Sequence, residues 1–265
     1  KILAFDMKGN KSTKTLTVER GAIEEASGPI FASLDPSAKK VKSNPNALAL
    51  IIGVADYEKT NAKAIYADKD AQTFYDYALL KLGVPAGNIK ELVNDGADEV
   101  EILKAVKTWL GRTAKSGQSD IYIYFAGHGL ASDDGEKMYL LPYDGAPELL
   151  DKTAILRTEL FNDIASANPR SVTVFLDTCY SGTTRGPDML IASRPIVIKA
   201  KEQAIPDNFT VFTAAAGDQT ANPLQEAEHG MFSYFLMKGI EGDADSNADN
   251  QITAGHLPAL SLIHL

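Results

Sequence analysis

The sequence predicts an α/β fold with a mainly parallel β-sheet that is covered by helices on both faces. Along most of the chain, short apolar runs typical of strands alternate with segments of helical period. Parallel strands need crossover connections, and the helices in those connections bury both faces of the sheet. The chain has 265 residues, of which 45% are hydrophobic, so it can bury the core of one large domain or two small ones.

The order of the elements follows from residue periodicity. Residues 1–44 contain strand-like pieces broken by Gly and Pro, so we expect a strand-like arm there. Beyond it, the alternation predicts strands at residues 47–54, 89–93, 120–127, 171–177 and 209–217. It predicts helices at residues 64–82, 99–114 and 229–242. In the last helix, apolar residues at helical spacing predict a core-facing side made of Met231, Phe232, Phe235, Leu236 and Ile240.

Composition and charge exclude several classes of protein. Lys and Arg number 26 against 35 Asp and Glu, a formal charge of -9 that repels nucleic acid, so we expect no nucleic-acid partner. The longest apolar run, residues 47–54, is far shorter than the roughly 20 residues of a membrane-spanning helix, so we expect no membrane span. The single cysteine excludes an intrachain disulfide and a metal site built from several cysteines.

The start of the chain is compatible with more than one cellular location. The chain begins with Lys1, and its first residues lack the pattern of a signal peptide, so we expect a processed form or an expressed fragment. A soluble cytoplasmic protein and an exported protein cut from a longer precursor both fit this start. The oligomeric state is open as well.

A histidine and the single cysteine follow two of the predicted strands. His128 stands just after the strand at residues 120–127, and Cys179 just after the strand at residues 171–177. Because ligand sites collect at the carboxyl ends of parallel strands, both side chains can reach one crevice if the strands are neighbours. An imidazole beside a thiol favours the thiolate, which attacks a carbonyl, and the imidazolium then protonates the leaving amine. We therefore predict Cys179 as nucleophile and His128 as general base.

The glycines around His128 favour an oxyanion hole. Gly127 and Gly129 allow the backbone to turn sharply, so the N–H groups of Gly129 and Cys179 can both point at a developing oxyanion. Each residue alone has a simpler interpretation. A lone cysteine after an apolar strand is usually a buried small hydrophobe, and a histidine between glycines is often structural. The pair, at two strand ends, is the stronger signal.

Four motifs resemble those of the caspase-like cysteine peptidases, and most of all those of bacterial metacaspases and orthocaspases: AGHG, DTCYSG, ALALIIGVADY and HGMFSYFL. The resemblance spans about residues 47–257, and it implies a three-layer caspase-like fold. His128 precedes Cys179 by 51 residues, close to the spacing in caspases. Tyr57 and His229 match family landmarks, although packing alone also explains them. True caspases have Gln-Ala-Cys at the nucleophile, and many metacaspases have His at the position of Tyr180.

The resemblance also implies how the chain is divided. In the family, a large subunit with His and Cys is followed by a small subunit that completes the same sheet. The matching regions here are residues 45–205 and residues 206–265, and whether the second is truncated stays open. The stretch at residues 182–206 carries three prolines and several basic residues and is a candidate processing linker. Its candidate self-cleavage sites are Arg185, Arg194, Lys199 and Lys201.

The metacaspase branch cleaves after Arg or Lys by means of acidic residues in its primary pocket, and the matching positions here are Asp177 and Asp70. Asp177 lies two residues before Cys179, on the same side of an extended chain. At Asp70 the match is partial, because the Asn-Asp pair of the family reads Lys69-Asp70 here. The structural alternatives are a cap for Asp177 and a solvated helix face for Asp70. The implied substrates are proteins or peptides with Arg or Lys before the cut.

Two acidic stretches raise the question of calcium. The candidate ligands are Asp133, Asp134, Asp245, Asn247 and Asp249. The later stretch resembles the first half of an EF-hand loop, but Asn250 replaces the expected Gly and His256 replaces the bidentate Glu. The earlier stretch resembles an acidic region where some metacaspases bind activating calcium, yet adjacent carboxylates on a loop are usually only solvated. We expect no required cofactor, and calcium activation stays open.

Other classes of function also fit the sequence. A caspase-like module without activity could bind partners or act as a scaffold, although both residues of the Cys-His dyad are present. A calcium-binding interaction domain would use the acidic C-terminal loop. A peptidase of another clan with specificity for basic residues would differ in strand order. Hydrolysis of a peptide library, with Cys179→Ala as the control, separates the enzyme from the binding modules.

Overall fold

The structure is a computed structural model, and it describes residues 2–5, 11–14, 31–178, 205–214 and 223–245. The chain divides into two compact units, Lys1–Ala32 and Ser33–Leu265. In the first unit, strand β1 (Ile2–Phe5) pairs antiparallel with strand β2 (Lys11–Lys14). The second unit contains every element discussed below.

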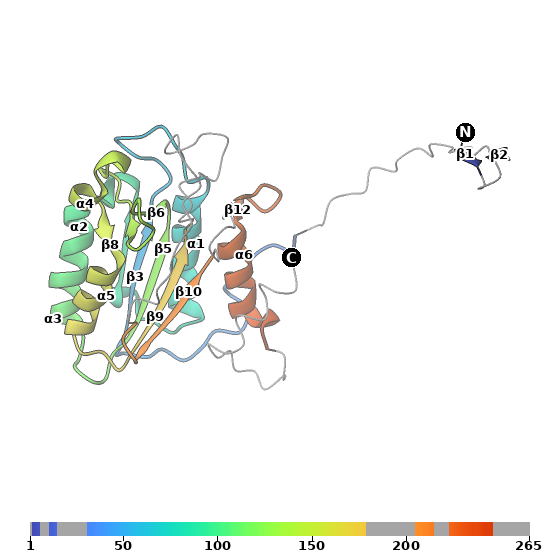
Figure 1. The fold of residues 1–265 in the computed structure, drawn as a ribbon. Coiled ribbons are helices and arrows are strands. Elements are labelled where there is room, and N and C mark those ends of the chain that lie inside the picture. The colour runs from blue at the N-terminus through green and yellow to red at the C-terminus, as the bar shows by residue number, and fades with distance from the viewer. Residues whose placement is uncertain (1, 6–10, 15–30, 179–204, 215–222, 246–265) are drawn as a thin grey trace. The chain divides into compact units, whose positions relative to one another are not determined.

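The second unit is built on a parallel sheet with the strand order β10–β9–β5–β3–β4 (Figure 1). The strands are β3 (Ala47–Gly53), β4 (Ile89–Val93), β5 (Asp120–Ala126), β9 (Ser171–Asp177) and β10 (Phe209–Thr213). All five lie where the sequence predicts strands, so the α/β class is confirmed. Because they are parallel, their carboxyl ends meet at one edge of the sheet.

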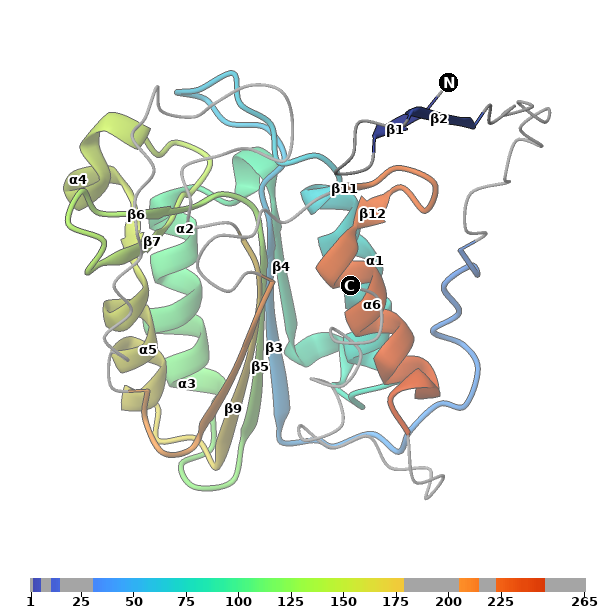
Figure 2. The ribbon, with the colours of Figure 1, turned by 45° about the vertical axis from the view of Figure 1, so that its right-hand side comes forward.

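Helices cover both faces of this sheet (Figures 1 and 2). One face carries α1 (Ala67–Leu80) and α6 (Met231–Lys238). The other carries α5 (Arg157–Ser166) and a continuous helical stretch made of α2 (Glu99–Leu103), the π-helical η3 (Lys104–Leu110) and α3 (Gly111–Thr113). The predicted three layers are confirmed. Within the described ranges, no helix has the length and apolar character that crossing a membrane requires.

The core lies on both sides of the sheet. All seven residues of β3 are buried, as expected of a strand covered on both faces. Helix α1 packs closely on this strand, because a Cβ atom on Gly53 would lie 2.5 Å from the carbonyl oxygen of Ala67. On the same face, the ring of Phe74 in α1 stacks on Tyr124 of β5 with the centroids 4.4 Å apart. Large aromatic side chains such as these supply much of the buried apolar area of a core.

Short elements complete the fold. A three-stranded antiparallel sheet follows β5 and consists of β6 (Gly129–Ala131), β7 (Met138–Leu140) and β8 (Ile155–Leu156). Strand β11 (Pro223–Leu224) pairs with β12 (His229–Gly230), so the last helix begins two residues later than predicted. The remaining short helices are η1 (Ala86–Asn88), η2 (Asn94–Gly96), η4 (Pro147–Leu149), α4 (Leu150–Thr153) and the π-helical η5 (Gly239–Asp243).

The buried side of α6 differs from the predicted one. Leu236 and Ile240 are buried as expected, whereas Met231, Phe232 and Phe235 are only partly buried. Ser233 is fully buried instead. Its hydroxyl takes part in two hydrogen bonds with buried groups, which offset the free-energy cost of removing it from water. The helix is therefore rotated so that a small polar residue faces the sheet.

Candidate active site

The carboxyl ends of β5 and β9 lie side by side. Ala126 stands opposite Asp177 in the parallel ladder, and the N–H of Gly127 donates to the Asp177 carbonyl oxygen at 3.3 Å. His128 therefore follows one strand end and lies next to the strand end that leads to Cys179. The two strands are neighbours, which is the condition that the sequence argument required. Cys179 itself lies outside the described residues.

His128 is buried and is held by the segment between β3 and α1. Its backbone N–H donates to the hydroxyl oxygen of Tyr57 at 2.7 Å, and the two rings stack with their centroids 4.8 Å apart. Its Nε2 lies 3.2 Å from the carbonyl oxygen of Ala62. A hydrogen bond of 2.9 Å from the N–H of Ala64 to the Ala55 carbonyl closes this segment into a loop. The loop thus contacts both the backbone and the ring of the histidine.

These contacts determine which ring nitrogen of His128 can accept a proton. A carbonyl oxygen only accepts hydrogen bonds, so Nε2 carries the proton in the contact with Ala62. In the neutral imidazole, the lone pair is then on Nδ1. The stacked ring of Tyr57 lies against the imidazole with the two planes 24° apart, so it helps to hold the plane of the ring in which Nδ1 lies. This arrangement suits a general base.

Two glycines shape the turn around His128. At Gly127, φ is 158°, and a Cβ atom there would lie 2.8 Å from the hydroxyl oxygen of Tyr57, so the tyrosine can approach only because the residue is glycine. Gly129 begins β6, is buried and stands opposite Leu140 of β7. Gly129, one of the two predicted oxyanion donors, thus follows His128 directly and belongs to the β6–β7 ladder. The other predicted donor, Cys179, lies outside the described part of the chain.

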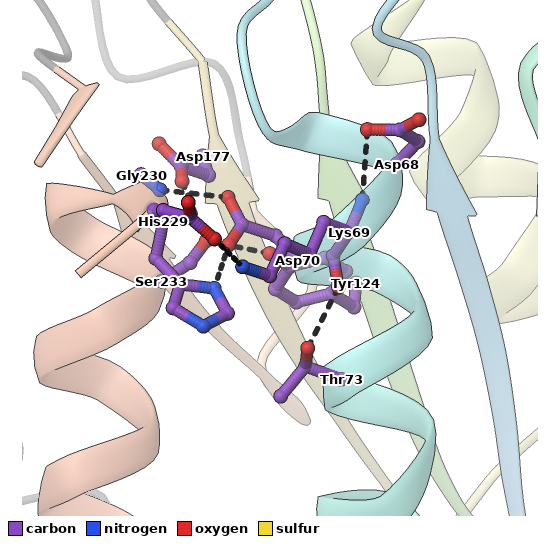
Figure 3. Close-up of polar contacts among 10 residues, drawn as sticks. Asp68, Lys69, Asp70, Thr73, Tyr124, Asp177, His229, Gly230 and Ser233 are labelled. Atoms are coloured by element: carbon purple, nitrogen blue, oxygen red, sulfur yellow. Dashed lines mark hydrogen bonds and ion pairs between the residues drawn. The ribbon is translucent and has the colours of Figure 1, made fainter. Parts of the chain in front are cut away.

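Two carboxylates are buried on the face of the sheet that α1 and α6 cover (Figure 3). Asp70, in the first turn of α1, has no exposed surface, so the solvated helix face that was one alternative does not exist. Its Oδ1 lies 2.6 Å from Nδ1 of His229, and its Oδ2 accepts the N–H of Gly230 at 2.9 Å. Because an ionised carboxylate only accepts hydrogen bonds, Nδ1 of His229 carries the proton. These partners compensate the burial of Asp70.

Asp177 is the second buried carboxylate and the last residue of β9. Its Oδ2 accepts a hydrogen bond of 2.5 Å from the hydroxyl of Ser233 in α6. The same hydroxyl lies 2.5 Å from the hydroxyl of Tyr124 in β5 (Figure 3). Asp177 is thus a strand-end residue within a hydrogen-bonded group, which replaces the alternative of a helix or turn cap.

Charged and polar residues connect α1 with the segment before α6. Lys69 forms an ion pair of 2.7 Å with Glu228, and the hydrogen bond from Lys69 lowers the pKa of the Glu228 carboxyl. The hydroxyl of Tyr66 donates to the side chain of Gln225 at 2.8 Å. Lys69 is the residue that departs from the Asn-Asp pattern. Its partner Glu228 directly precedes the two residues that bind Asp70.

The remaining predicted residues are the candidate calcium ligands and the candidate cleavage sites, and only some of them lie in the described part of the chain. Oδ1 of Asp134 accepts hydrogen bonds from Ser132 and from the N–H of Glu136, and the bond from Ser132 lowers the pKa of the Asp134 carboxyl. Among the described residues, no group of three or more His, Cys, Asp or Glu side chains could hold a metal ion. Asn247, Asp249 and the candidate cleavage sites Arg185, Arg194, Lys199 and Lys201 lie outside the described residues.

Sequence reasoning missed three groups that shape this site. They are the carbonyl of Ala62, the hydroxyl of Ser233 and the hydroxyl of Tyr124. A backbone carbonyl gives no sequence signal. The serine, by contrast, was detectable as a polar residue within the apolar run of the last predicted helix, and the tyrosine as a polar tip within an apolar strand.

The chain matches a known family over most of its length. Residues 46–254 match the family model of the caspase domain, and this range includes both strand ends of the site. No curated protein matches the sequence significantly.

Three solved structures are similar to this one at low sequence identity. Protein GSU0716 from Geobacter sulfurreducens is 20% identical with a TM-score of 0.42, and the match covers 52% of each chain, about half of that protein's length. Caspase-1 from Spodoptera frugiperda is 12% identical with a TM-score of 0.46, covering 79% of this chain and 75% of that one. The Drosophila initiator caspase Dronc is 14% identical with a TM-score of 0.44, covering 88% and 81%. On the match of residues 46–254, the chain belongs to the caspase domain family.

Proposed function

We propose that this chain is a cysteine endopeptidase that cleaves peptide bonds after Arg or Lys, with Cys179 as nucleophile and His128 as general base. The observation that carries the proposal is the way His128 is held at the end of β5. Its Nε2 faces the Ala62 carbonyl, and the neighbouring strand leads to Cys179. Membership of the caspase domain family supports a cysteine peptidase in general.

The proposed reaction uses only groups of this chain and the substrate. Nδ1 of His128 takes the proton of the Cys179 thiol, and the thiolate attacks the carbonyl carbon of the peptide bond. The N–H groups of Gly129 and Cys179 stabilise the oxyanion that forms. The imidazolium then gives its proton to the leaving amine, the C–N bond breaks, and water hydrolyses the thioester that remains. No metal or cofactor is needed for these steps.

The preference for a basic residue before the cut rests on Asp177 and Asp70. Both carboxylates are fully buried, and Asp177 is two residues from the proposed nucleophile. A buried carboxylate attracts a cationic side chain more strongly than a solvated one does, because the surrounding protein screens charge poorly. An acidic side chain in the same place would repel it and lose its own hydration. This chemistry resembles that of the metacaspase and orthocaspase branch, to which we assign the chain.

The first test is hydrolysis of a fluorogenic peptide library by three proteins. Wild type should cleave, and Cys179→Ala and His128→Ala should each lose activity by a factor on the order of 10⁴ or more, because nucleophile and base act as a unit. Circular dichroism should show that both variants keep the fold. Turnover retained by purified Cys179→Ala would refute the mechanism, and a folded but inactive wild type would favour a binding module.

The second test concerns the charge of Asp177. Matched peptides that differ only in the residue before the cut should be cleaved after Arg or Lys and hardly at all after Asp. Asp177→Asn keeps the size of the side chain and removes its charge, so kcat/KM on Lys peptides should fall about 100-fold. Faster cleavage after Asp by wild type would instead place the chain with the true caspases.

A further inference from the structure

Three buried polar groups form a hydrogen-bonded chain from the middle of the sheet to the proposed substrate pocket. The hydroxyl of Tyr124, the hydroxyl of Ser233 and Oδ2 of Asp177 follow each other at 2.5 Å each, and none of the three residues has exposed surface (Figure 3). They come from β5, α6 and β9. This row of hydrogen bonds therefore joins three elements at the strand end that precedes Cys179.

The direction of each hydrogen bond follows from counting protons. The Asp177 carboxylate only accepts, so the single proton of the Ser233 hydroxyl points to it. The oxygen of Ser233 is then the acceptor for the Tyr124 hydroxyl proton. Hydrogen bonds in such a row polarise one another, so Tyr124 strengthens the donor that Ser233 offers to the carboxylate.

Both acidic residues of the proposed pocket are held by one short piece of chain. His229 and Gly230 bind Asp70, and Ser233 binds Asp177. The stacking of Phe74 on Tyr124 fixes the far end of the row. The segment from His229 to Ser233 thus sets the orientation of two carboxylates that the chain places more than one hundred residues apart.

We propose that Ser233 is a positioning residue for substrate specificity, which fixes the Asp177 carboxylate so that it receives the cationic side chain of Lys or Arg. Tyr124 acts through Ser233 in this role, because its hydroxyl is hydrogen-bonded to the Ser233 hydroxyl. The inference rests on the proposed function, because it takes Asp177 as the group that binds the basic side chain.

The test measures binding, so that it does not depend on turnover. Each variant is made in the Cys179→Ala protein, and its affinity is measured by fluorescence anisotropy for two labelled peptides that differ only in having Lys or norleucine before the cut. Norleucine has the carbon chain of Lys without its charge, so the ratio of the two dissociation constants reports the contribution of the cation. This ratio is independent of the fraction of protein that is folded.

Ser233→Ala should lower the preference for Lys about tenfold, because the carboxylate loses a buried donor. Ser233→Thr keeps the hydroxyl and should stay within about twofold of the parent protein, allowing for the extra methyl group. Tyr124→Phe should give a smaller loss, about threefold, since it only weakens the Ser233 donor. In the Ser233→Ala background, Tyr124→Phe should change nothing more, because its effect passes through the serine.

Ser171→Ala is the matched control. Ser171 begins β9, and its hydroxyl donates to Oδ1 of Asp120 at 2.7 Å, so the variant removes the same kind of hydrogen bond at the opposite end of the same strand. Ser171→Ala should lower the urea concentration at the midpoint of unfolding without altering the preference for Lys. An equal loss of Lys preference in Ser171→Ala would show that the effect of Ser233→Ala is not specific to its hydrogen bond with Asp177, and that result would overturn the inference.

Hydrolysis by wild type separates this inference from the proposed function. If wild type cleaves after Lys but Ser233→Ala keeps the full preference, the positioning role is wrong and the peptidase stands. If wild type does not cleave but the preference depends on Ser233 as described, the peptidase proposal fails and the positioning role stands. The absence of any Lys preference in the parent protein would overturn the positioning role as well. If Ser233→Ala does not fold, Tyr124→Phe decides, because it leaves Ser233 and Asp177 in place.

Discussion

His128 is held by contacts of two kinds, and each kind predicts a different effect of mutation. The hydroxyl of Tyr57 accepts the backbone N–H of His128, and the tyrosine ring stacks on the imidazole. The hydroxyl therefore fixes where the backbone of the histidine lies, whereas the ring holds the plane of the imidazole. The Ala62 carbonyl adds the orientation of the ring nitrogens.

Tyr57→Phe removes the hydroxyl and keeps the ring, so it leaves the buried N–H of His128 without its acceptor, a loss worth about 1–3 kcal/mol. We expect kcat on Lys peptides to fall about tenfold with KM nearly unchanged. Tyr57→Leu also removes the ring, and it should further slow alkylation of the Cys179 thiol by iodoacetamide at neutral pH. The control is Tyr77→Phe, which also removes a tyrosine hydroxyl, but one that binds Glu241. An equal fall of kcat in Tyr77→Phe would contradict the local role of Tyr57.

Residue types at strand ends were predictable, but their partners were not. His128 and Asp177 follow from their places after apolar strands, because parallel strands bring their carboxyl ends to one edge. The partners Ser233 and His229 are in contact with residues more than fifty positions away, and no local pattern carries that information. Asp70 was recognised only through the resemblance, since a carboxylate near a helix start is usually solvated.

At the scale of elements, the five parallel strands were predictable for a physical reason. Strands that are buried on both faces consist of continuous apolar residues, and β3 is buried throughout. Strands β6 to β8 have only two or three residues each, too few to show a period. In α6, apolar residues occur on several sides, so the buried face was decided by the hydrogen bonds of Ser233 rather than by hydrophobic spacing.

At the amino-terminal ends of the strands, a cluster of polar groups surrounds Asp120, the first residue of β5. Its carboxylate accepts hydrogen bonds from Nε of Arg170 at 2.8 Å, from the Ser171 hydroxyl at 2.7 Å and from Nδ2 of Asn44 at 3.0 Å. Burial acts to raise the pKa of the Asp120 carboxyl, but the hydrogen bonds from Arg170 and Ser171 outweigh burial, and the pKa is lowered. The cluster connects the beginnings of β5 and β9 with the residues before β3.

Because the pKa of Asp120 is lower in the folded than in the unfolded chain, its stabilisation is present above the unfolded value of about 3.9 and is lost as the pH falls through the folded value. Asp120→Asn should reduce the free energy of unfolding by about 1–2 kcal/mol at pH 7. The difference from wild type should shrink below about pH 4. Urea unfolding of both proteins between pH 7 and pH 2.5 measures this difference in the free energy of unfolding. If the difference is the same over the whole range, the charge of Asp120 is not the cause of the stabilisation.

At the scale of the whole molecule, the part of the chain after the candidate linker is bound to the part before it at several places. Strand β10 pairs with β9 from Phe209 opposite Val172 to Thr213 opposite Leu176. Helix α6 lies beside α1 on the same face of the sheet (Figures 1 and 2). At the far end of α1, the side chain of Glu241 binds the hydroxyl of Tyr77. These contacts need no covalent connection through residues 182–206.

Self-processing in that linker is therefore expected to leave one folded particle. Active protein should cut itself after Arg185, Arg194, Lys199 or Lys201, and mass spectrometry should find new termini there that are absent from Cys179→Ala. Size-exclusion chromatography should show the two pieces together, because the β9–β10 ladder and the buried contacts of Asp70 and Asp177 remain closed. Urea should separate them. Identical intact masses under activating conditions would argue against self-processing, and pieces that separate without denaturant would show that the ladder and these contacts are too weak to hold the second part in place.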